Sequence, residues 1–176
     1  MSDAFFRCED RDEDVAELLV RAQQAGWTVR ELHEGETLML SERAEAHVVQ
    51  AAQEPLDKGN ELSMVLEVAY AGRSILFTGD LGARYEQADR YPDCDVLKVA
   101  HHGSKYSTGE ALLDSARPEI AVISVGYNTY GHPAQEALSR LAAAGAQVYR
   151  TDECGLITVY VSPEGELSIS TFLEEP

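Results

Sequence analysis

The stretch between Ser74 and Ser104 decides the fold of this chain. It opens with Ser74-Ile75-Leu76-Phe77-Thr78-Gly79-Asp80 and, after a polar interval, continues with Asp95-Val96-Leu97-Lys98-Val99-Ala100-His101-His102-Gly103-Ser104. Short apolar runs bounded by glycine are typical of buried strands. One strand would end at Asp80 and the next at His101-His102, which places a carboxylate and imidazoles at the rim of a sheet. Such oxygen and nitrogen ligands suit zinc, manganese or iron.

The same residues have a plainer interpretation, in which Thr78-Gly79-Asp80 is only a turn and the two histidines only lie on the surface. A third histidine, in Tyr130-Gly131-His132-Pro133, favours a site. Asn128, Tyr130 and His132 lie between an expected strand and an expected helix. Because ligands collect outside the carboxyl ends of strands in open α/β sheets, all three segments can face one cleft.

Outward from this stretch, segments with strand and helix patterns alternate, which indicates α/β layers. Gly26 and Gly145 are expected helix stops, and Ala71-Gly72 predicts a tight hairpin. Helices are predicted at 11–25, 82–90, 109–116 and 133–144, with Pro133 in the first turn of the last. Strands are predicted at 27–32, 37–40, 47–51, 63–70, 73–78, 96–100, 119–125, 147–150, 156–161 and 166–171. Residues 53–60 read as a polar loop, and Thr151-Asp152 as the start of another, structural one.

Composition limits the possible partners. The chain has 176 residues, enough for one domain with a sizeable core. With 14 Lys and Arg against 31 Asp and Glu, its net charge is −17, so general neutralisation of nucleic-acid phosphates is excluded. A polyanion would have to be held by metal ions and a local patch such as Arg84, Lys98 and Lys105.

The location in the cell is left open by these features. No apolar run is long enough to cross a membrane, and the N-terminus lacks the regions of a signal peptide. We expect the chain as given to be soluble; one interpretation is that it is detached from a membrane protein. The cysteines Cys8, Cys94 and Cys154 are far apart and predict neither a disulfide framework nor a structural zinc site.

Glycines 126 and 131 would let backbone N–H groups approach an anion, and the N-terminus of the helix after His132 would favour a phosphate. Two alternatives remain open here. Gly131-His132-Pro133 could merely cap the helix, or residues 126–133 could bind a phosphate or nucleotide without any metal.

Six ordered motifs carry a resemblance to a known family. They are residues 60–66, Leu76-Phe77-Thr78-Gly79-Asp80, residues 95–105, Ile123-Ser124-Val125-Gly126, Tyr130-Gly131-His132-Pro133 and Tyr149-Arg150-Thr151-Asp152. Their order and spacing over residues 60–161 resemble the metallo-β-lactamase-like domain that ends ComEC-type DNA-uptake proteins. This resemblance implies an αββα sandwich with two divalent metal ions, zinc or manganese, between its sheets. It also implies a metal-dependent hydrolase, namely a phosphodiesterase or nuclease acting on DNA or another phosphodiester.

The resemblance also implies roles for individual residues. Asp80 would bridge the two metals, and one of His101 and His102 would be a further metal ligand, with His102 favoured. His101 and His132 would then be catalytic, contacting the scissile phosphate or protonating the leaving oxygen. The substrate-binding residues expected in these motifs are Ser104, Lys105, Asn128 and Tyr130.

One family motif is missing from the sequence. The signature His-x-His-x-Asp-His is absent, and the histidines before Asp80, His33 and His47, match nothing in the family and read as surface residues. The chain, residues 1–176, therefore resembles the C-terminal half of the domain. We expect its metal site to need ligands from another chain or segment; the alternative is a catalytically silent remnant that binds or scaffolds. An uncovered sheet face and edge also predict self-association.

Overall fold

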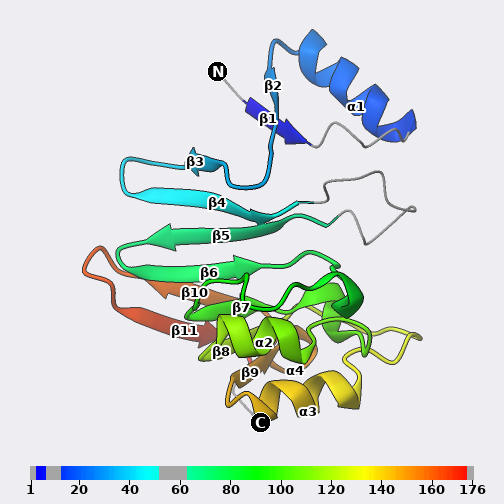
Figure 1. Ribbon diagram of the computed structural model, residues 1–176, viewed down its shortest axis with the longest axis vertical. Coiled ribbons are helices and arrows are strands. Elements are labelled where there is room, and N and C mark those ends of the chain that lie inside the picture. Colours follow the sequence, from blue (N-terminus) through cyan, green and yellow to red (C-terminus); the bar gives the residue numbers. More distant parts are fainter. Residues whose placement is uncertain (1–2, 7–12, 52–62, 174–176) are drawn as a thin grey trace.

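A seven-stranded mixed sheet forms the centre of the protein (Figure 1). The computed structural model describes residues 3–6, 13–51 and 63–173. The strands lie in the order β3 (Thr37–Met39), β4 (Ala44–Gln50), β5 (Val65–Tyr70), β6 (Arg73–Phe77), β7 (Val96–Lys98), β8 (Ile120–Ile123) and β9 (Gln147–Arg150). Neighbours from β3 to β6 are antiparallel, whereas those from β6 to β9 are parallel. The predicted α/β class with a mixed sheet is therefore what the structure shows.

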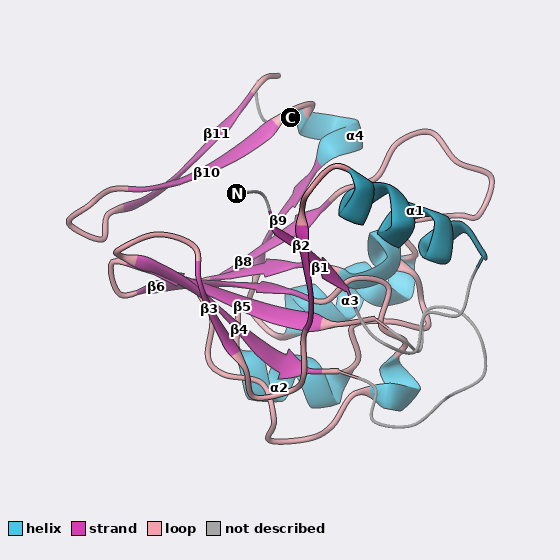
Figure 2. Ribbon diagram, turned by 90° about the horizontal axis from the view of Figure 1, so that it is seen from above, coloured by secondary structure: helices cyan, strands magenta, loops and turns pink. Residues whose placement is uncertain are grey.

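Helices α2 (Glu110–Ala116) and α3 (Gln135–Ala143) connect the parallel strands. The antiparallel hairpin of β10 (Ile157–Val161) and β11 (Leu167–Thr171) follows the short helix α4 (Thr151–Cys154). Figure 2 shows this hairpin on the side of the sheet away from α2. At the other end of the chain, α1 (Glu13–Gln24) joins the parallel strands β1 (Asp3–Phe6) and β2 (Thr28–Glu31).

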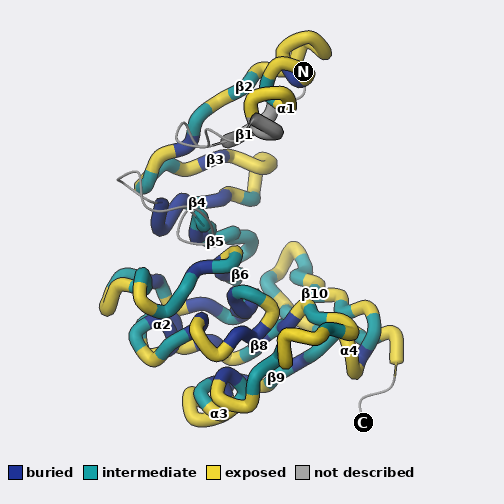
Figure 3. The backbone as a smooth tube through the Cα atoms, turned by 90° about the vertical axis from the view of Figure 1, so that its right-hand side faces the viewer, coloured by how far each residue is buried: buried dark blue, intermediate teal, exposed yellow. Residues whose placement is uncertain are grey.

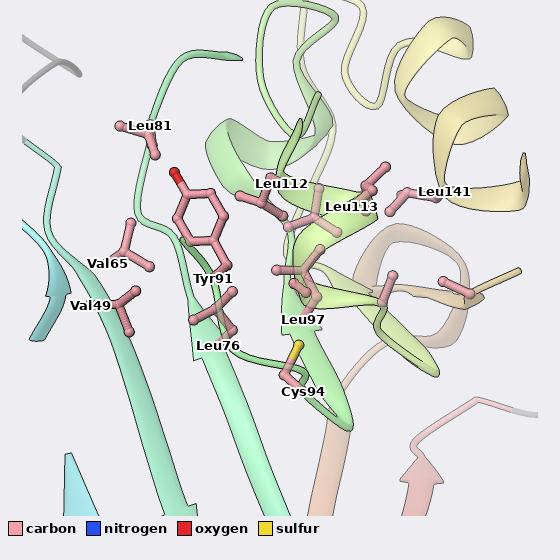
Figure 4. Packing of buried hydrophobic residues seen from close by; sticks show 14 of the residues in the cluster. Val49, Val65, Leu76, Leu81, Tyr91, Cys94, Leu97, Leu112, Leu113 and Leu141 are labelled. Carbon is pink, nitrogen blue, oxygen red and sulfur yellow. The ribbon is translucent and has the colours of Figure 1, made fainter. Parts of the chain in front are cut away.

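The main core lies between the sheet and helices α2 and α3 (Figure 4). Leu76 of β6 and Leu97 of β7 are fully buried there, as are Leu112 of α2 and Leu141 of α3. Successive residues of a strand point to opposite faces of the sheet, so every second residue faces the helices. This cluster fixes the relative positions of the strand ends that carry the candidate site.

The opposite face of the sheet is covered less completely. A smaller cluster that includes Leu38, Ala46 and Val48 covers its β3–β5 part. Phe77, on the same face at the end of β6, is 41% exposed. Helix α1 is also poorly covered, since Ala22 is buried whereas Leu18 is 63% exposed (Figure 3). Within the described residues, no helix combines the length and the apolar character that a membrane span requires.

Three sequence predictions need correction. The helix predicted at 82–90 is only a 3-10 turn, Ala83–Tyr85, because the N–H of Ala83 donates to the carbonyl of Tyr106 and draws the chain toward that loop. Helix α3 begins at Gln135, after Pro133, because the backbone of Ala134 is extended, with φ −73° and ψ 146°, and its N–H donates to the carbonyl of Gly103.

The third correction concerns Thr151, which opens helix α4 instead of a loop. Its Oγ1 accepts a hydrogen bond from the N–H of Val125 at 2.8 Å and donates to the carbonyl of the same residue at 2.7 Å. The predicted structural role is consistent with these bonds, which tie the ends of β8 and β9 together. The polar loop predicted at 53–60 lies outside the described residues.

Candidate functional site

The parallel strands bring the predicted site residues to one edge of the sheet. Strands β6, β7, β8 and β9 run in the same direction, so their carboxyl ends meet there. Asp80 follows β6, and His101-His102 follow β7. The loop with Asn128, Tyr130 and His132 follows β8. This is the edge at which open α/β sheets bind their ligands.

Asp80 sits on a tight turn whose geometry is set by its neighbours. Gly79 has a φ of +53°, and a Cβ there would lie 3.2 Å from Ser63 Oγ. The N–H of Asp80 donates to that Oγ at 3.0 Å. Burial lowers the pKa of the nearby Lys98 ammonium, and the negative charge of Asp80 partly offsets this effect. Asp80 and Lys98 therefore share one electrostatic environment.

The histidine pair occupies an unusual backbone conformation. His101 and His102 have φ values of +47° and +54°, in the left-handed region that side chains other than glycine rarely adopt. The N–H of His101 donates to the carbonyl of Gly79 at 3.1 Å, which joins the turn before Asp80 to the histidine turn. Left-handed non-glycine residues cost on the order of 1 kcal/mol or more each and cluster at functional sites.

Gly103 completes this turn, and any side chain there would require its surroundings to shift. Its φ is +81°, and a Cβ at this position would lie 2.6 Å from the Cβ of Pro133. The close approach brings the segment around His132 against the turn that carries His101 and His102. Two segments far apart in the sequence are thereby locked together.

His102 has the partner expected of a metal-binding histidine. Its Nδ1 lies 2.7 Å from the carbonyl oxygen of Ser124. A carbonyl can only accept, so Nδ1 carries the proton and Nε2 of the neutral ring keeps its lone pair. A backbone carbonyl on the second nitrogen is the usual way in which a protein orients a ligating histidine. The bond is compatible with His102 as the ligand, while the choice between His101 and His102 stays a prediction.

His132 packs beside the pair. Its ring centroid lies 5.6 Å from that of His101, in an edge-on arrangement, and 6.1 Å from that of Tyr130, which is stacked on it. Burial lowers the pKa of His132, and His101 and His102 lower it further. Its Nδ1 is buried without a hydrogen-bond partner. The neutral ring therefore presents an unsatisfied nitrogen among the other rings.

The loop before His132 is held by Asn128. The Oδ1 of Asn128 accepts from the N–H groups of Tyr130 and His132, at 3.1 and 3.0 Å. Its Nδ2 donates to the carbonyls of Gly126 and His132, at 2.9 and 2.7 Å. These contacts position the loop, while the predicted contact of Asn128 with substrate stays a prediction.

The loop after the histidine pair is held by hydrogen bonds from a side chain of helix α3. Arg140 of α3 donates to the carbonyls of Lys105, Ser107 and Thr108, at 3.1, 2.9 and 2.9 Å. Sequence reasoning missed these bonds, because nothing in the pattern of α3 distinguishes Arg140 from a solvated helix residue.

The two residues of this loop predicted to bind substrate lie in different environments. Ser104 is buried, and its Oγ accepts from the N–H of Tyr106 at 3.3 Å. Lys105 is exposed, with its Nζ 4.9 Å from the centroid of the Tyr106 ring. Lys105 is therefore accessible to a solvent-borne ligand, whereas Ser104 supports the loop from inside.

A pocket of about 320 Å³ opens beside these side chains. The residues that line it include His102, Gly126, Tyr127, Tyr130 and His132. Sequence reasoning missed Tyr127, although an aromatic residue between two chemistry-bearing segments was a usable signal. Asp80 is not among the residues that line this pocket.

The donors suit a divalent metal in kind but not in number. Asp80 and His102 supply a carboxylate and an oriented imidazole. Across the described parts of the chain, however, no three His, Cys, Asp or Glu side chains converge on one point. A catalytic zinc usually takes three protein ligands, so these residues alone do not fit a complete metal site.

The comparisons with known proteins identify the family. The model of the metallo-beta-lactamase superfamily matches residues 10–127, and the chain belongs to this superfamily, whose members generally bind divalent metals. The predicted resemblance to ComEC-type proteins is confirmed by relatives from three bacteria.

The chain is 39% identical over 158 residues to ComE operon protein 3 of Bacillus subtilis, a match that covers 86% of this chain and 20% of that protein. It is 38% identical over 104 residues to competence protein ComA of Neisseria gonorrhoeae, a match that covers 56% of this chain and 15% of that protein. It is 40% identical over 103 residues to Recombination protein 2 of Haemophilus influenzae, a match that covers 57% of this chain and 13% of that protein. The chain thus spans a fifth or less of the length of these relatives.

Proposed function

We propose that this chain contributes the Asp80 and histidine side of a metal-dependent phosphodiesterase that acts on DNA during uptake. The superfamily and the names of the competence-protein relatives support the DNA-uptake context. The observation that carries the proposal is the bond between His102 Nδ1 and Ser124, which leaves Nε2 available as a ligand on the same sheet edge as Asp80.

In this proposal the side chains have distinct tasks. Asp80 and His102 would hold metal, zinc or manganese, and His101 and His132 would contact the phosphate. The lowered pKa of His132 favours its neutral form near pH 7 in the metal-free protein. A hydrogen-bonding contact with the phosphate therefore suits His132 better than a role as a charged acid. Lys105, which is exposed, would contact a more distant part of the substrate.

We further propose that the site is completed by ligands from another chain or segment. The absence of His-x-His-x-Asp-His from the sequence and of three converging ligands among the described side chains supports this. The exposed apolar residues Leu18 and Phe77 support the predicted self-association, which sedimentation over a range of concentrations would measure.

The test is a calorimetric titration of the chain with Zn²⁺ and Mn²⁺, alone and mixed with a polypeptide that carries the His-x-His-x-Asp-His segment of a ComEC-type relative. We expect weak binding alone, binding at least tenfold tighter in the mixture, and hydrolysis of a phosphodiester only in the mixture. Asp80→Ala should abolish both the tighter binding and the hydrolysis, because it removes the carboxylate that would hold the metal.

Asp114→Ala is the matched control, since Asp114 is an exposed carboxylate of α2 outside the site. Full activity in the Asp80→Ala mixture would exclude the bridging role. If neither metal binds under any of these conditions, the chain is the silent binding or scaffolding domain of the alternative interpretation.

A further inference from the structure

Aromatic rings form a continuous series at the candidate site. The ring of His101 contacts that of His132, and the ring of Tyr130 stacks on His132 with an interplanar angle of 24°. The series ends in solvent, because Tyr130 is 83% exposed. A stack that ends on an open ring can be continued by another flat ring.

A second exposed ring lies in the same pocket. Tyr127 is 100% exposed and lines the pocket together with Tyr130 and His132. Between the two tyrosines, Asn128 makes four hydrogen bonds to the loop. The loop is therefore held by polar contacts, while the apolar surfaces of its two tyrosine rings stay exposed to solvent. Rings presented on a fixed backbone lose little freedom when a ligand binds.

The negative charge of the chain limits which interactions can supply affinity for a ligand at these rings. With a net charge of −17, attraction to phosphates cannot supply general affinity for a nucleic acid. Stacking of bases on aromatic side chains does not depend on charge and contributes about 5- to 150-fold in affinity per base. The bases of a duplex are already stacked on one another, so only unpaired bases are available to such rings.

We propose that Tyr127 and Tyr130 form a stacking platform for unpaired nucleotide bases, so that the site selects single-stranded over duplex DNA. This inference rests on the proposed function and adds the substrate form and two residues that determine it. The pocket beside the platform is lined by His102 and His132, so a base stacked there would bring its backbone toward one candidate metal ligand and one candidate catalytic residue.

The experiment measures binding of a fluorescein-labelled oligothymidylate by anisotropy, at low ionic strength and with EDTA present. The same strand annealed to oligodeoxyadenylate is the duplex probe. We expect the single strand to bind at least tenfold more tightly than the duplex. Tyr127→Ala and Tyr130→Ala should each weaken single-strand binding about 5- to 100-fold, and Tyr130→Phe should recover most of the loss by restoring the ring.

Tyr160→Ala is the matched control, since Tyr160 is 57% exposed on β10 and does not line the pocket. Equal binding of both probes, unchanged binding in the two alanine variants, or no binding of the single strand would overturn the platform; the last result would point to a protein partner for these rings. EDTA removes any dependence on metal, and Asp80→Ala tests the hydrolase separately, so the two proposals can fail independently.

Discussion

Helices α3 and α1 carry similar amphipathic patterns but have very different surroundings. Leu141 of α3 is completely buried in the main core, whereas Leu18 of α1 is 63% exposed. Arg140 of α3 donates hydrogen bonds to the loop next to the histidine pair, while Arg21 of α1 forms an exposed ion pair with Glu17, one turn away. An apolar stripe thus predicts that a helix forms, but not that the stripe finds a partner. The site lies at the end of the well-packed part, whose buried cluster fixes the strand ends that carry it.

The sharpest test of this contrast is the same substitution in both helices. Leu141→Ala should lower the free energy of unfolding by about 2–5 kcal/mol, because it leaves a cavity in the core. Leu18→Ala should change it by no more than about 0.5 kcal/mol. Urea unfolding of the full chain measures both. Comparable losses would mean that α1 is covered in solution, for example by another copy of the chain.

Two glycines with similar backbone angles give the next largest difference. Gly103→Ala should cost about 2 kcal/mol or more, because the new Cβ would clash with Pro133 in addition to the unfavourable φ. Gly26→Ala should cost only about 1 kcal/mol, since a Cβ at Gly26 meets nothing within 4 Å. Thermal unfolding of both variants decides the order. If Gly103→Ala were the milder change, the close approach of Pro133 would not exist in solution.

The two arginines should differ by a smaller amount. Arg140→Met should cost about 1–3 kcal/mol, since the carbonyls of Lys105, Ser107 and Thr108 lose a charged donor. It should also speed amide hydrogen exchange in residues 104–109. Arg21→Met should cost about 0.5 kcal/mol or less, because its ion pair with Glu17 is exposed. Unchanged exchange in the Arg140 variant would show that the loop does not depend on these bonds.

The smallest effect is a difference in titration between two carboxyl groups. Burial raises the pKa of Glu86 above 4.5, although the N–H of Gly109 opposes this. The N–H of His33 lowers the pKa of Glu36 below 4.5. As the pH falls, the folded protein should therefore gain stability from protonation of Glu86 between its raised pKa and 4.5. It should lose the contribution of Glu36 below 4.5. Carbon-13 NMR titration of the carboxyl groups measures both midpoints, and the reverse order would contradict the burial of Glu86.

Local signals in the sequence were enough for most of the fold. Ala71-Gly72 predicted a hairpin, and both residues have positive φ between β5 and β6. Patterns failed where a distant segment decided the local conformation. The contact of Ala83 with Tyr106 prevented a helix, and the approach of Gly103 to Pro133 delayed the start of α3.

The candidate site divides in the same way. Strand ends with Asp80 and His101-His102 could be read from the sequence, because parallel strands bring their ends together. The partner of His102 could not be read from the sequence, since it is a backbone carbonyl 22 positions away and no residue type identifies it. Arg140 was missed for the same reason, since its contacts are with carbonyls of a loop more than 30 positions away.

The bond between His102 and Ser124 has a genetic consequence. Every amino acid at position 124 would supply the same backbone carbonyl. The orientation of the His102 ring therefore depends on the backbone conformation and not on the identity of the side chain at position 124. In a mutational scan, position 124 should tolerate many residues while position 102 does not. Loss of this orientation would then come from changes at a distance, such as at Gly103, that shift one loop against the other.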